Sequence, residues 1–264
     1  MTAMLGEVLA DLEAESGQVD HLVVDLSAGR WSTPTPAAGW TIAHQIAHLA
    51  WTDDIAIIAA TDPFAFRRVV EDAMADPLGH TDRMAAEGAA TQPAYLLRRW
   101  QDGRHRLAET LRVLPQGTKI PWFGPSMSGT TMATARLMET WAHGHDVAEA
   151  LNIDVVPNDR VRHVCHLAVR SRSFAYHVRG LTPPSDDFRV DLIGPSGSTW
   201  SWGPVDSQQH VTGAAWDFAL LATRRRHRRD VDVTAVGEQA EKWLEVIQAF
   251  AGPSGADPVP LADR

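Results

Sequence analysis

The chain has 264 residues, 44% hydrophobic and 22% charged, which is typical of a folded globular protein and excludes a wholly disordered one. Its formal net charge of −9 argues against a nucleic-acid partner. The single cysteine, Cys165, excludes an internal disulfide and any site built from several cysteines, and it fits a reducing compartment.

Residues 1–154 have the pattern of a helical bundle, with apolar side chains recurring at helical spacing. Thr41 is placed as an N-cap, and Asp62-Pro63 ends the helix that it begins. Four principal helices are predicted, over 3–26, from Thr41 to Asp62, 92–113 and 129–151. Short helices interrupted at Pro77 and Gly79 fill the segment 64–90. This arrangement favours a four-helix bundle.

Residues 155–252 have a different pattern, in which short alternating segments follow a turn-rich stretch. We predict a helix over 158–179, strands Phe188–Ile193, Ser198–Trp202 and Gln208–Thr212, a helix over 213–225, a strand over 231–236 and a helix over 236–251. The order predicts a small α+β domain with a mostly antiparallel sheet. Residues 253–264, rich in Pro, Gly and Asp, are predicted to be a flexible tail.

No segment directs the chain to a membrane or out of the cell. The N-terminus lacks the basic start and apolar run of a signal peptide, and no stretch approaches about 18 uncharged apolar residues. We therefore expect a cytoplasmic protein without a membrane partner. Of the 24 basic residues only Lys119 and Lys242 are lysines, a bias typical of GC-rich actinobacterial genomes.

Two pairs of metal-ligand side chains stand out at helical spacing. His44 and His48 share one face of the second helix, and Glu139 and His143 share one face of the fourth. A carboxylate buried between helices needs a cation, and two imidazoles with one carboxylate leave a coordination position open, as in catalytic zinc or ferrous iron sites. The alternative is that each residue is an ordinary polar group on a helix surface.

The residues around these pairs resemble a known family. Gly39-Trp40-Thr41 with His48-Leu49-Ala50, and Arg136-x-x-Glu139-x-x-x-His143-x-x-Asp146, resemble the two motifs of DinB-like bundles, in particular of the mycothiol-dependent maleylpyruvate isomerase branch. The resemblance covers nearly the whole chain. It implies a DinB-like four-helix bundle in which His48, Glu139 and His143 bind a divalent metal, usually zinc. It also implies a small sterol-carrier-like α+β domain after the bundle.

The chain departs from the isomerases at His44, one turn before His48, and at His145, beside His143. It is in this respect more similar to an uncharacterised actinobacterial subfamily of metal-binding proteins. His44 could assist the metal, act as an acid–base group, contact substrate or be a plain polar residue, and His145 could shuttle protons. Asp146 could orient a ligand imidazole or be a surface acid.

Other side chains near these motifs have two interpretations each. Arg136 could bind the anionic cofactor or substrate, or pair with Glu139 on the helix surface. Trp40, Trp51 and Trp141 could wall the pocket or simply pack in the core. In the basic run 224–229, the resemblance implies that Arg224 or Arg225 reaches the active site; the alternative is a solvated run that complements a helix C-terminus.

The favoured function is therefore an enzyme that depends on Zn²⁺, or on another divalent metal such as Ni²⁺ or Fe²⁺, and uses mycothiol as cosubstrate. It would isomerise a small electrophilic substrate, possibly one with a carboxylate, or transfer the thiol to it. One alternative is a metal-dependent hydrolase with His44 or His145 as proton shuttle. Another is a protein without catalytic activity that binds a metal and an apolar ligand. The expected state is a monomer or a homodimer.

Overall fold

The computed structural model describes residues 2–263. The packing of the backbone divides the chain into two compact units, Met1–Val155 and Val156–Arg264. Among the described residues, no helix is both long and apolar enough to cross a membrane. The predicted organisation, a helical N-terminal part followed by a small sheet-and-helix part, is confirmed.

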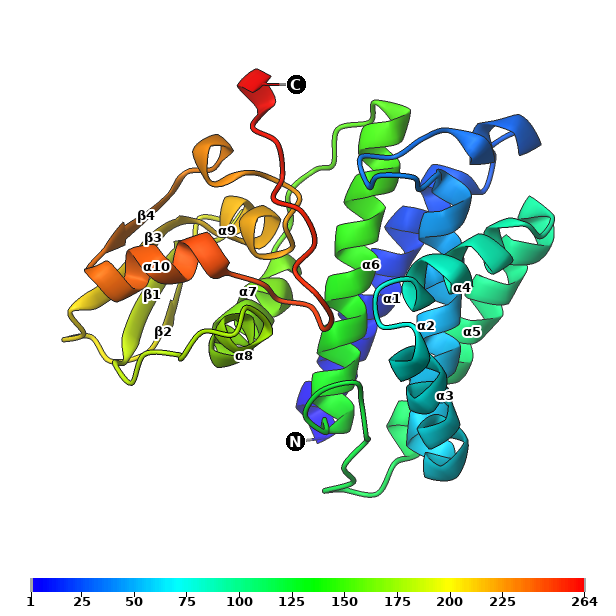
Figure 1. The fold of residues 1–264 in the computed structure, drawn as a ribbon, viewed down its shortest axis with the longest axis horizontal. Coiled ribbons are helices and arrows are strands. Elements are labelled where there is room, and N and C mark those ends of the chain that lie inside the picture. Colours follow the sequence, from blue (N-terminus) through cyan, green and yellow to red (C-terminus); the bar gives the residue numbers. More distant parts are fainter. Residues whose placement is uncertain (1, 264) are drawn as a thin grey trace. The chain divides into compact units, whose positions relative to one another are not determined.

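The first unit is helical throughout (Figure 1). Its α-helices are α1 (Thr2–Val23), α2 (Ile42–Thr61), α3 (Pro63–Ala75), α4 (His80–Ala89), α5 (Pro93–Val113) and α6 (Gly129–Leu151). α1 packs mainly along α6 and α2 mainly along α5, while α2 also packs against α6 and α4. The four predicted principal helices and the two short ones between them are confirmed. A 3₁₀ turn, Ala28–Ser32, interrupts the loop before α2.

Local sequence signals explain where these helices begin and end. Thr41 precedes α2 and forms a capping box with His44. The Asp62 side chain accepts hydrogen bonds from the backbone at the start of α3, where Pro63 takes the first position. Ser128 caps α6 in the same way. Each cap stabilises its helix by about 1 kcal/mol, so these ends are fixed locally, before tertiary packing.

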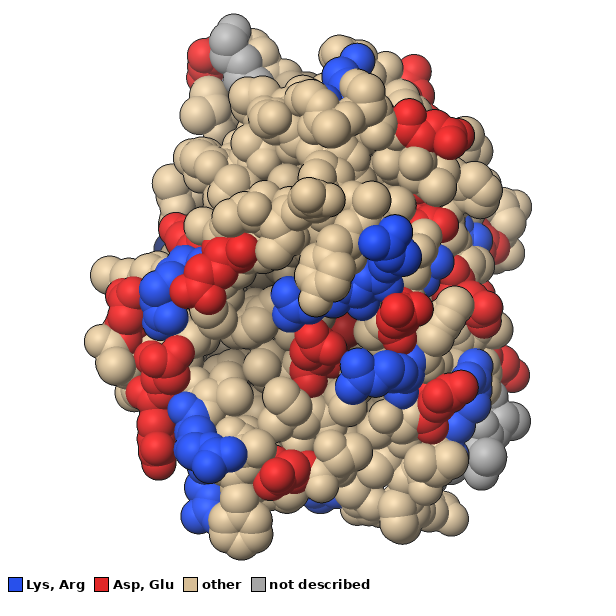
Figure 2. Space-filling model, turned by 90° about the vertical axis from the view of Figure 1, so that its right-hand side faces the viewer, with Lys and Arg blue, Asp and Glu red and all other residues tan. Residues whose placement is uncertain are grey.

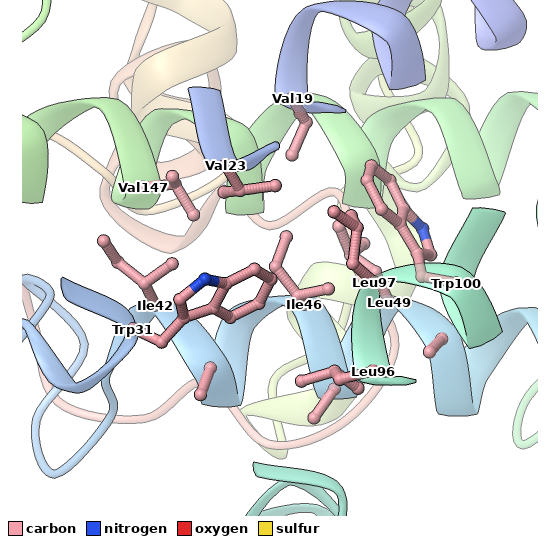
Figure 3. Close-up of a cluster of buried hydrophobic side chains, with 13 residues drawn as sticks. Val19, Val23, Trp31, Ile42, Ile46, Leu49, Leu96, Leu97, Trp100 and Val147 are labelled. Carbon is pink, nitrogen blue, oxygen red and sulfur yellow. The ribbon is translucent and has the colours of Figure 1, made fainter. Parts of the chain in front are cut away.

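The core of the first unit lies where α1, α2, α5 and α6 meet (Figure 3). The labelled side chains are Val19, Val23, Trp31, Ile42, Ile46, Leu49, Leu96, Leu97, Trp100 and Val147. Trp31 comes from the 3₁₀ turn, and its ring lies between Ile42 and Ile46 (Figure 3). Burial of each large side chain contributes about 1.5–3 kcal/mol before the loss of chain entropy is counted. The apolar face of α2 is therefore held between α5 and α6.

The face of the molecule that includes α3, α4 and α5 carries acidic and basic side chains in alternation (Figure 2). Arg99 pairs with Asp54 at 2.9 Å, and Arg83 lies 3.4 Å from Asp72. Pairs that are partly exposed contribute at most about 1 kcal/mol each, because solvent screens them. The alternation leaves this face without a broad surface of one charge.

Two glycines mark the closest approaches between helices. A Cβ atom on Gly88 of α4 would lie 2.7 Å from the Cβ of Ala47 on α2, and one on Gly144 of α6 would lie 2.6 Å from Cγ2 of Val19 on α1. Carbon atoms in packed interiors do not come this close. Both positions therefore need glycine so that the helix backbones can approach.

The second unit is a four-stranded sheet covered by short helices (Figure 1). Its elements are α7 (Val161–Arg170), α8 (Arg172–Val178), β1 (Phe188–Ile193), β2 (Thr199–Trp202), β3 (Gln209–Ala214), α9 (Ala215–Ala222), β4 (Val233–Val236) and α10 (Glu238–Val246). The strand order is β2-β1-β3-β4. The fully buried Trp243 of α10 contacts the rings of Phe188 and Phe218, which centres the core beneath β1.

One prediction for the second unit needs correction, whereas the predicted, mostly antiparallel sheet is confirmed with one parallel pair at its centre. The single helix predicted over 158–179 is two helices separated at Ser171, whose hydroxyl shares its one proton between the carbonyl oxygens of Ala168 (3.2 Å) and Gln248 (3.1 Å). A serine that bonds to the backbone in this way competes with helix continuation. The two central strands, β1 and β3, are parallel, with Val190 opposite Val211, although the outer pairs are antiparallel as predicted.

The segment predicted to be a flexible tail contacts the basic run. Nη2 of Arg224 is 2.6 Å from Oδ1 of Asp257, and Arg229 pairs with Asp263. The carboxylate of Asp230 accepts from the backbone N–H of Leu261 at 3.0 Å. Three contacts between charged side chains and the C-terminal segment thus connect it to the run 224–230.

Asp191 on β1 is the centre of a cluster of polar side chains. Arg189 donates to it at 2.8 Å, His210 lies 2.8 Å away, and Ser201 donates from β2. The hydrogen bond from Arg189 holds the pKa of the Asp191 carboxyl well below its usual range. Partial burial opposes this lowering of the pKa, and the hydrogen bonds from Ser201 and His210 add to it. A carboxyl with a lowered folded-state pKa stabilises the fold only while it is ionised.

We expect Gly88→Ala to lower the free energy of unfolding by about 1–3 kcal/mol, because the added methyl group forces α4 away from α2. Gly17→Ala is the matched control, since a Cβ there meets nothing within 4 Å. Alanine is the better helix former, so the control should be unchanged or more stable by up to about 1 kcal/mol. Urea unfolding measures both. Equal stability of the two variants would contradict the close packing of α4 on α2.

We expect Asp191→Asn to lower stability by about 1 kcal/mol at pH 7. Because the pKa of Asp191 is lowered in the folded state, its contribution is complete above the unfolded-state pKa of about 3.9 and is lost as the pH falls toward the folded-state value. The difference between variant and wild type should therefore shrink below about pH 4. Urea unfolding between pH 7 and pH 3 measures it, with Asp206→Asn in the exposed β2–β3 loop as control. A difference that stays constant over this range would refute the assignment.

Candidate metal centre

Three side chains from two helices converge in the first unit. His48 comes from α2, and Glu139 and His143 come from α6. Nε2 of His48 lies 3.4 Å from Oε2 of Glu139, and Nε2 of His143 lies 3.2 Å from the same oxygen. One turn of α6 separates Glu139 from His143, so both reach the same face. Packing of α2 against α6 supplies the third group.

The donor atoms of these residues suit a divalent cation. One donor atom from each residue can be chosen so that all three lie within 4.8 Å of one another. In a tetrahedral zinc site with bonds of about 2.0–2.2 Å, neighbouring ligand atoms are about 3.4 Å apart. The two distances between imidazole and carboxylate match this spacing. The residues fit a metal, and three protein ligands leave one position for a further ligand.

Glu139 supplies the negative charge of the cluster. Its burial by itself raises the pKa of the carboxyl, but hydrogen bonds from His143 and His48 outweigh burial and hold that pKa well below its usual range. Glu139 is therefore a carboxylate at neutral pH. A buried carboxylate flanked by two imidazoles attracts either protons on those rings or a cation between them.

Trp40 covers the two imidazoles. Its ring stacks on His143 at a centroid distance of 5.9 Å and an angle of 18°, and lies 5.4 Å from the ring of His48. Its Nε1 donates to the carboxylate of Asp82 on α4 at 2.9 Å. Trp51 approaches His48 from α2, with ring centroids 5.9 Å apart. The predicted positions of Trp40 and Trp51 beside the ligands thus agree with the structure, while their role stays a prediction.

Arg136 pairs with α2 and not with Glu139, which was one of the two partners that the sequence allowed for it, beside an anionic cofactor or substrate. Its Nε donates to Oδ1 of Asp53 at 2.9 Å and its Nη2 to Oγ1 of Thr52 at 2.6 Å, both on α2. Arg136 is only 2% exposed. Burial raises the pKa of Asp53, and the nearby guanidinium opposes that rise. Pairing with Glu139 is therefore wrong, because an ion pair across the helix interface satisfies the buried guanidinium.

Three other predicted site residues have their own contacts. Nδ1 of His44 lies 2.8 Å from the Thr41 hydroxyl as part of the capping box, so at least one nitrogen serves the start of α2. Nδ1 of His145 bonds to the carbonyl oxygen of Trp141, and the two rings pack together. Two residues along a helix are about 200° apart around its axis. The structure therefore does not bring His145 or Trp141 to the cluster.

The sequence analysis missed the residue that contacts His143 most directly. Oε1 of Gln45 on α2 bonds to Nδ1 of His143. Oδ2 of Asp146, for which the sequence allowed a role as partner of an imidazole or as a surface acid, lies 3.8 Å from that atom and is buried, so the surface alternative is wrong. Gln45 is fully buried within an apolar stretch. One sign of this role was present in the sequence: Gln45 is a single amide among mostly apolar residues, one turn before His48 and on the same face of the helix.

Arg224 and Arg225 belong to the second unit. Nη2 of Arg224 donates to the backbone oxygen of Ala256 as well as to Asp257, and Nη1 of Arg225 donates to the carbonyl oxygen of Thr223. Arg224 has a left-handed backbone with φ of 60°, which is uncommon for a side chain of this size. These hydrogen bonds of the two arginines all lie within the second unit.

Comparison with known proteins gives two family matches. Residues 12–148 match the model of the mycothiol maleylpyruvate isomerase N-terminal domain, and residues 184–236 match a model described as wyosine base formation. Over 250 residues the chain is 54% identical to an uncharacterized protein found in two strains of Mycobacterium tuberculosis, covering 95% of this chain and 97% of the relative. The predicted actinobacterial kinship is confirmed for these homologues.

Two solved structures are similar in fold to most of the chain. They are the crystal structure of the mycothiol-dependent maleylpyruvate isomerase and that of a histidine-to-alanine mutant. Each has a TM-score of 0.57 and covers 88% of this chain and 92% of its own, at 15% and 16% identity. At such low identity the likeness shows the fold alone. The sterol-carrier-like character of the second unit stays a prediction.

We expect Arg136→Met to lower stability by about 3–5 kcal/mol, because Asp53 would remain buried without its cation. The double variant Arg136→Met/Asp53→Leu should lose less than the single one, since it leaves no buried charge unpaired. Arg99→Met breaks a partly exposed ion pair with Asp54 and should cost less than about 1 kcal/mol. Urea unfolding of the three variants measures this. An Arg136→Met protein as stable as Arg99→Met would show that the pair is not buried as described.

Proposed function

Because the chain belongs to the mycothiol maleylpyruvate isomerase N-terminal domain family, we propose that it is a divalent-metal-dependent enzyme that uses mycothiol. Its substrate is a small electrophile, which it isomerises or to which it transfers the thiol. The metal is zinc in this proposal. Ni²⁺ or Fe²⁺ could take its place, because both also bind imidazole ligands. The observation that supports it is the convergence of His48, Glu139 and His143 on one point between α2 and α6.

His48, Glu139 and His143 would hold a divalent cation, which would supply a Lewis acid that lowers the pKa of a thiol and favours its thiolate at neutral pH. Glu139 balances part of the cation's charge. Trp40 and Trp51 surround the imidazoles with apolar rings, which exclude water and strengthen electrostatic interactions there.

The thiolate carries out the reaction on the substrate. It would add to one carbon of an electrophilic double bond, with the electron pair of that bond moving to the adjacent carbonyl group. Rotation about the resulting single bond and expulsion of the thiolate would give the geometric isomer and return the thiolate unchanged. If a proton is taken up before expulsion, the product is the thiol adduct. The two outcomes therefore differ in a single proton transfer.

A carboxylate on the substrate needs a cation other than Arg136, whose guanidinium binds Asp53 and Thr52. Arg224 and Arg225 remain our candidates. Arg224 has the required chemistry, because it binds the carboxylate of Asp257 at 2.6 Å in this structure. Its participation at the metal centre is part of the proposal.

We expect protein purified without an affinity tag to contain about one equivalent of divalent metal. His48→Ala, Glu139→Ala and His143→Ala should each lose most of it, because two remaining ligands do not hold the ion. His145→Ala, on another face of α6, is the matched control and should retain the metal. Elemental analysis by mass spectrometry measures the content. Equal metal retention in all four variants would refute the ligand set.

The catalytic part of the proposal is tested with the metal-loaded protein, mycothiol and maleylpyruvate, followed by absorbance and by product analysis. Turnover that requires both metal and mycothiol supports it, and conversion of other electrophiles would extend the substrate range. Ester or amide hydrolysis without thiol would favour the hydrolase alternative. A metal that stays bound while a panel of electrophiles and esters is left unchanged would favour a binding protein.

A further inference from the structure

We propose that Gln45 is a positioning residue that fixes the tautomer of His143 and thereby directs its Nε2 lone pair to the metal. This inference rests on the metal site of the proposed function. Three hydrogen bonds connect the carbonyl oxygen of Trp40 to Nδ1 of His143 through Thr35 and Gln45, and the donor of each is fixed by its neighbours.

The chain of hydrogen bonds begins at the backbone carbonyl oxygen of Trp40, which can only accept. The Thr35 hydroxyl lies 3.0 Å from that oxygen and must donate to it. The backbone N–H of Thr35 donates to the same oxygen, with its nitrogen 2.8 Å away. A hydroxyl has one proton. With that proton directed at Trp40, Oγ1 of Thr35 can only accept from its other neighbour.

That neighbour is the side-chain amide of Gln45. The amide atom 2.8 Å from Oγ1 of Thr35 must therefore be the nitrogen, Nε2. The oxygen of the same amide, Oε1, then faces Nδ1 of His143. Because an amide oxygen accepts only, Nδ1 of His143 carries the proton. The carbonyl oxygen of Trp40 thus fixes which end of the Gln45 amide is the nitrogen and which is the oxygen.

A neutral imidazole with its proton on Nδ1 has its lone pair on Nε2. In His143, Nε2 lies 3.2 Å from Oε2 of Glu139. This distance suits a positive charge between the two atoms, either a proton, as in the hydrogen bond from His143 to Glu139, or a metal ion that takes the place of that proton and binds the lone pair of Nε2. Gln45 therefore prepares His143 as a ligand before the metal arrives, which is the usual role of a group behind a metal-bound histidine.

Burial makes this arrangement rigid. Gln45 is fully buried, and an unsatisfied amide there would cost several kcal/mol. Both ends of the amide are satisfied only in the orientation described. His48 differs, since its buried Nδ1 has no hydrogen-bond partner among the described residues. The orientation of His48 depends on ring packing with Trp40 and Trp51, so the two histidines are unequal ligands.

The test compares three substitutions that separate the acceptor from the rest of the side chain. Gln45→Leu removes the acceptor and keeps the volume. Gln45→Glu keeps an oxygen that accepts from Nδ1 of His143. Thr35→Val removes the hydroxyl that orients the amide. Gln101→Leu, which removes a partly buried amide that bonds to Asp20, is the matched control for loss of an amide in the bundle.

Zinc affinity is measured by competition with a chromophoric chelator, and the tautomer of His143 by long-range ¹H–¹⁵N NMR of the metal-free protein with neutral imidazoles. We expect the wild type to have the Nδ1–H form. Gln45→Leu should bind zinc about 10–100-fold more weakly and lose the preference for that form. The zinc affinity of Gln45→Glu should stay within about threefold of the wild-type value, and that of Thr35→Val should fall between the values for Gln45→Leu and Gln45→Glu. The zinc affinity of Gln101→Leu should be unchanged.

Zinc affinity of Gln45→Leu equal to that of Gln101→Leu, or an Nε2–H form in the wild type, would overturn the assignment. If Gln45→Leu does not fold, the NMR tautomer of the wild type and the comparison of Gln45→Glu with Thr35→Val decide it. Failure of the metal site itself has a separate signature, because His143→Ala would then bind zinc as the wild type does.

Discussion

The packing of α2 against α6 is the constraint on which the rest of the first unit depends. It places the Glu139 carboxylate between the imidazoles of His48 and His143, with oxygen–nitrogen distances of 3.4 and 3.2 Å. Farther along the same interface, Arg136 reaches Asp53. The interface thus has two polar layers, one of His48, Glu139 and His143 and one of Arg136 and Asp53. A shift of one helix along the other would leave buried charges unpaired in both layers, at a cost of several kcal/mol. The polar layers therefore specify the register that apolar packing alone would leave less sharply defined.

The two layers have separate charge balances, and this separation has a functional consequence. The layer of Arg136 and Asp53 is neutral by itself, whereas the layer of His48, Glu139 and His143 carries a carboxylate and needs added positive charge. Only the second layer can therefore attract a cation. The same argument removes Arg136 from the groups available to an anionic substrate, although its position one turn before Glu139 suggests otherwise.

Local signals in the sequence predicted the helix boundaries well, because caps such as Thr41 and Asp62 act within one turn. The i, i+4 spacing gave the pairing of Glu139 with His143 for the same reason. Contacts between elements were less predictable. The partner of Arg136 and the parallel pairing of β1 with β3 depend on which elements meet, and that information is not local. Gln45 was missed because its place one turn before His48 is a weak signal, which does not show that the amide contacts His143 across the interface.

The motif Gly39-Trp40-Thr41 now has a physical explanation at each position. Gly39 adopts φ of 78°, which turns the loop toward α2 at little steric cost. Trp40 stacks on His143, donates to Asp82, and offers the carbonyl oxygen that orients Thr35 and Gln45. Thr41 then caps the helix that carries His48. Trp40 contacts the rings of both His48 and His143, and in the proposed arrangement its carbonyl oxygen orients the amide behind His143, so the loop and the candidate metal centre are joined through side chain and backbone. Three consecutive residues thus couple helix initiation, shielding of the site and ligand orientation.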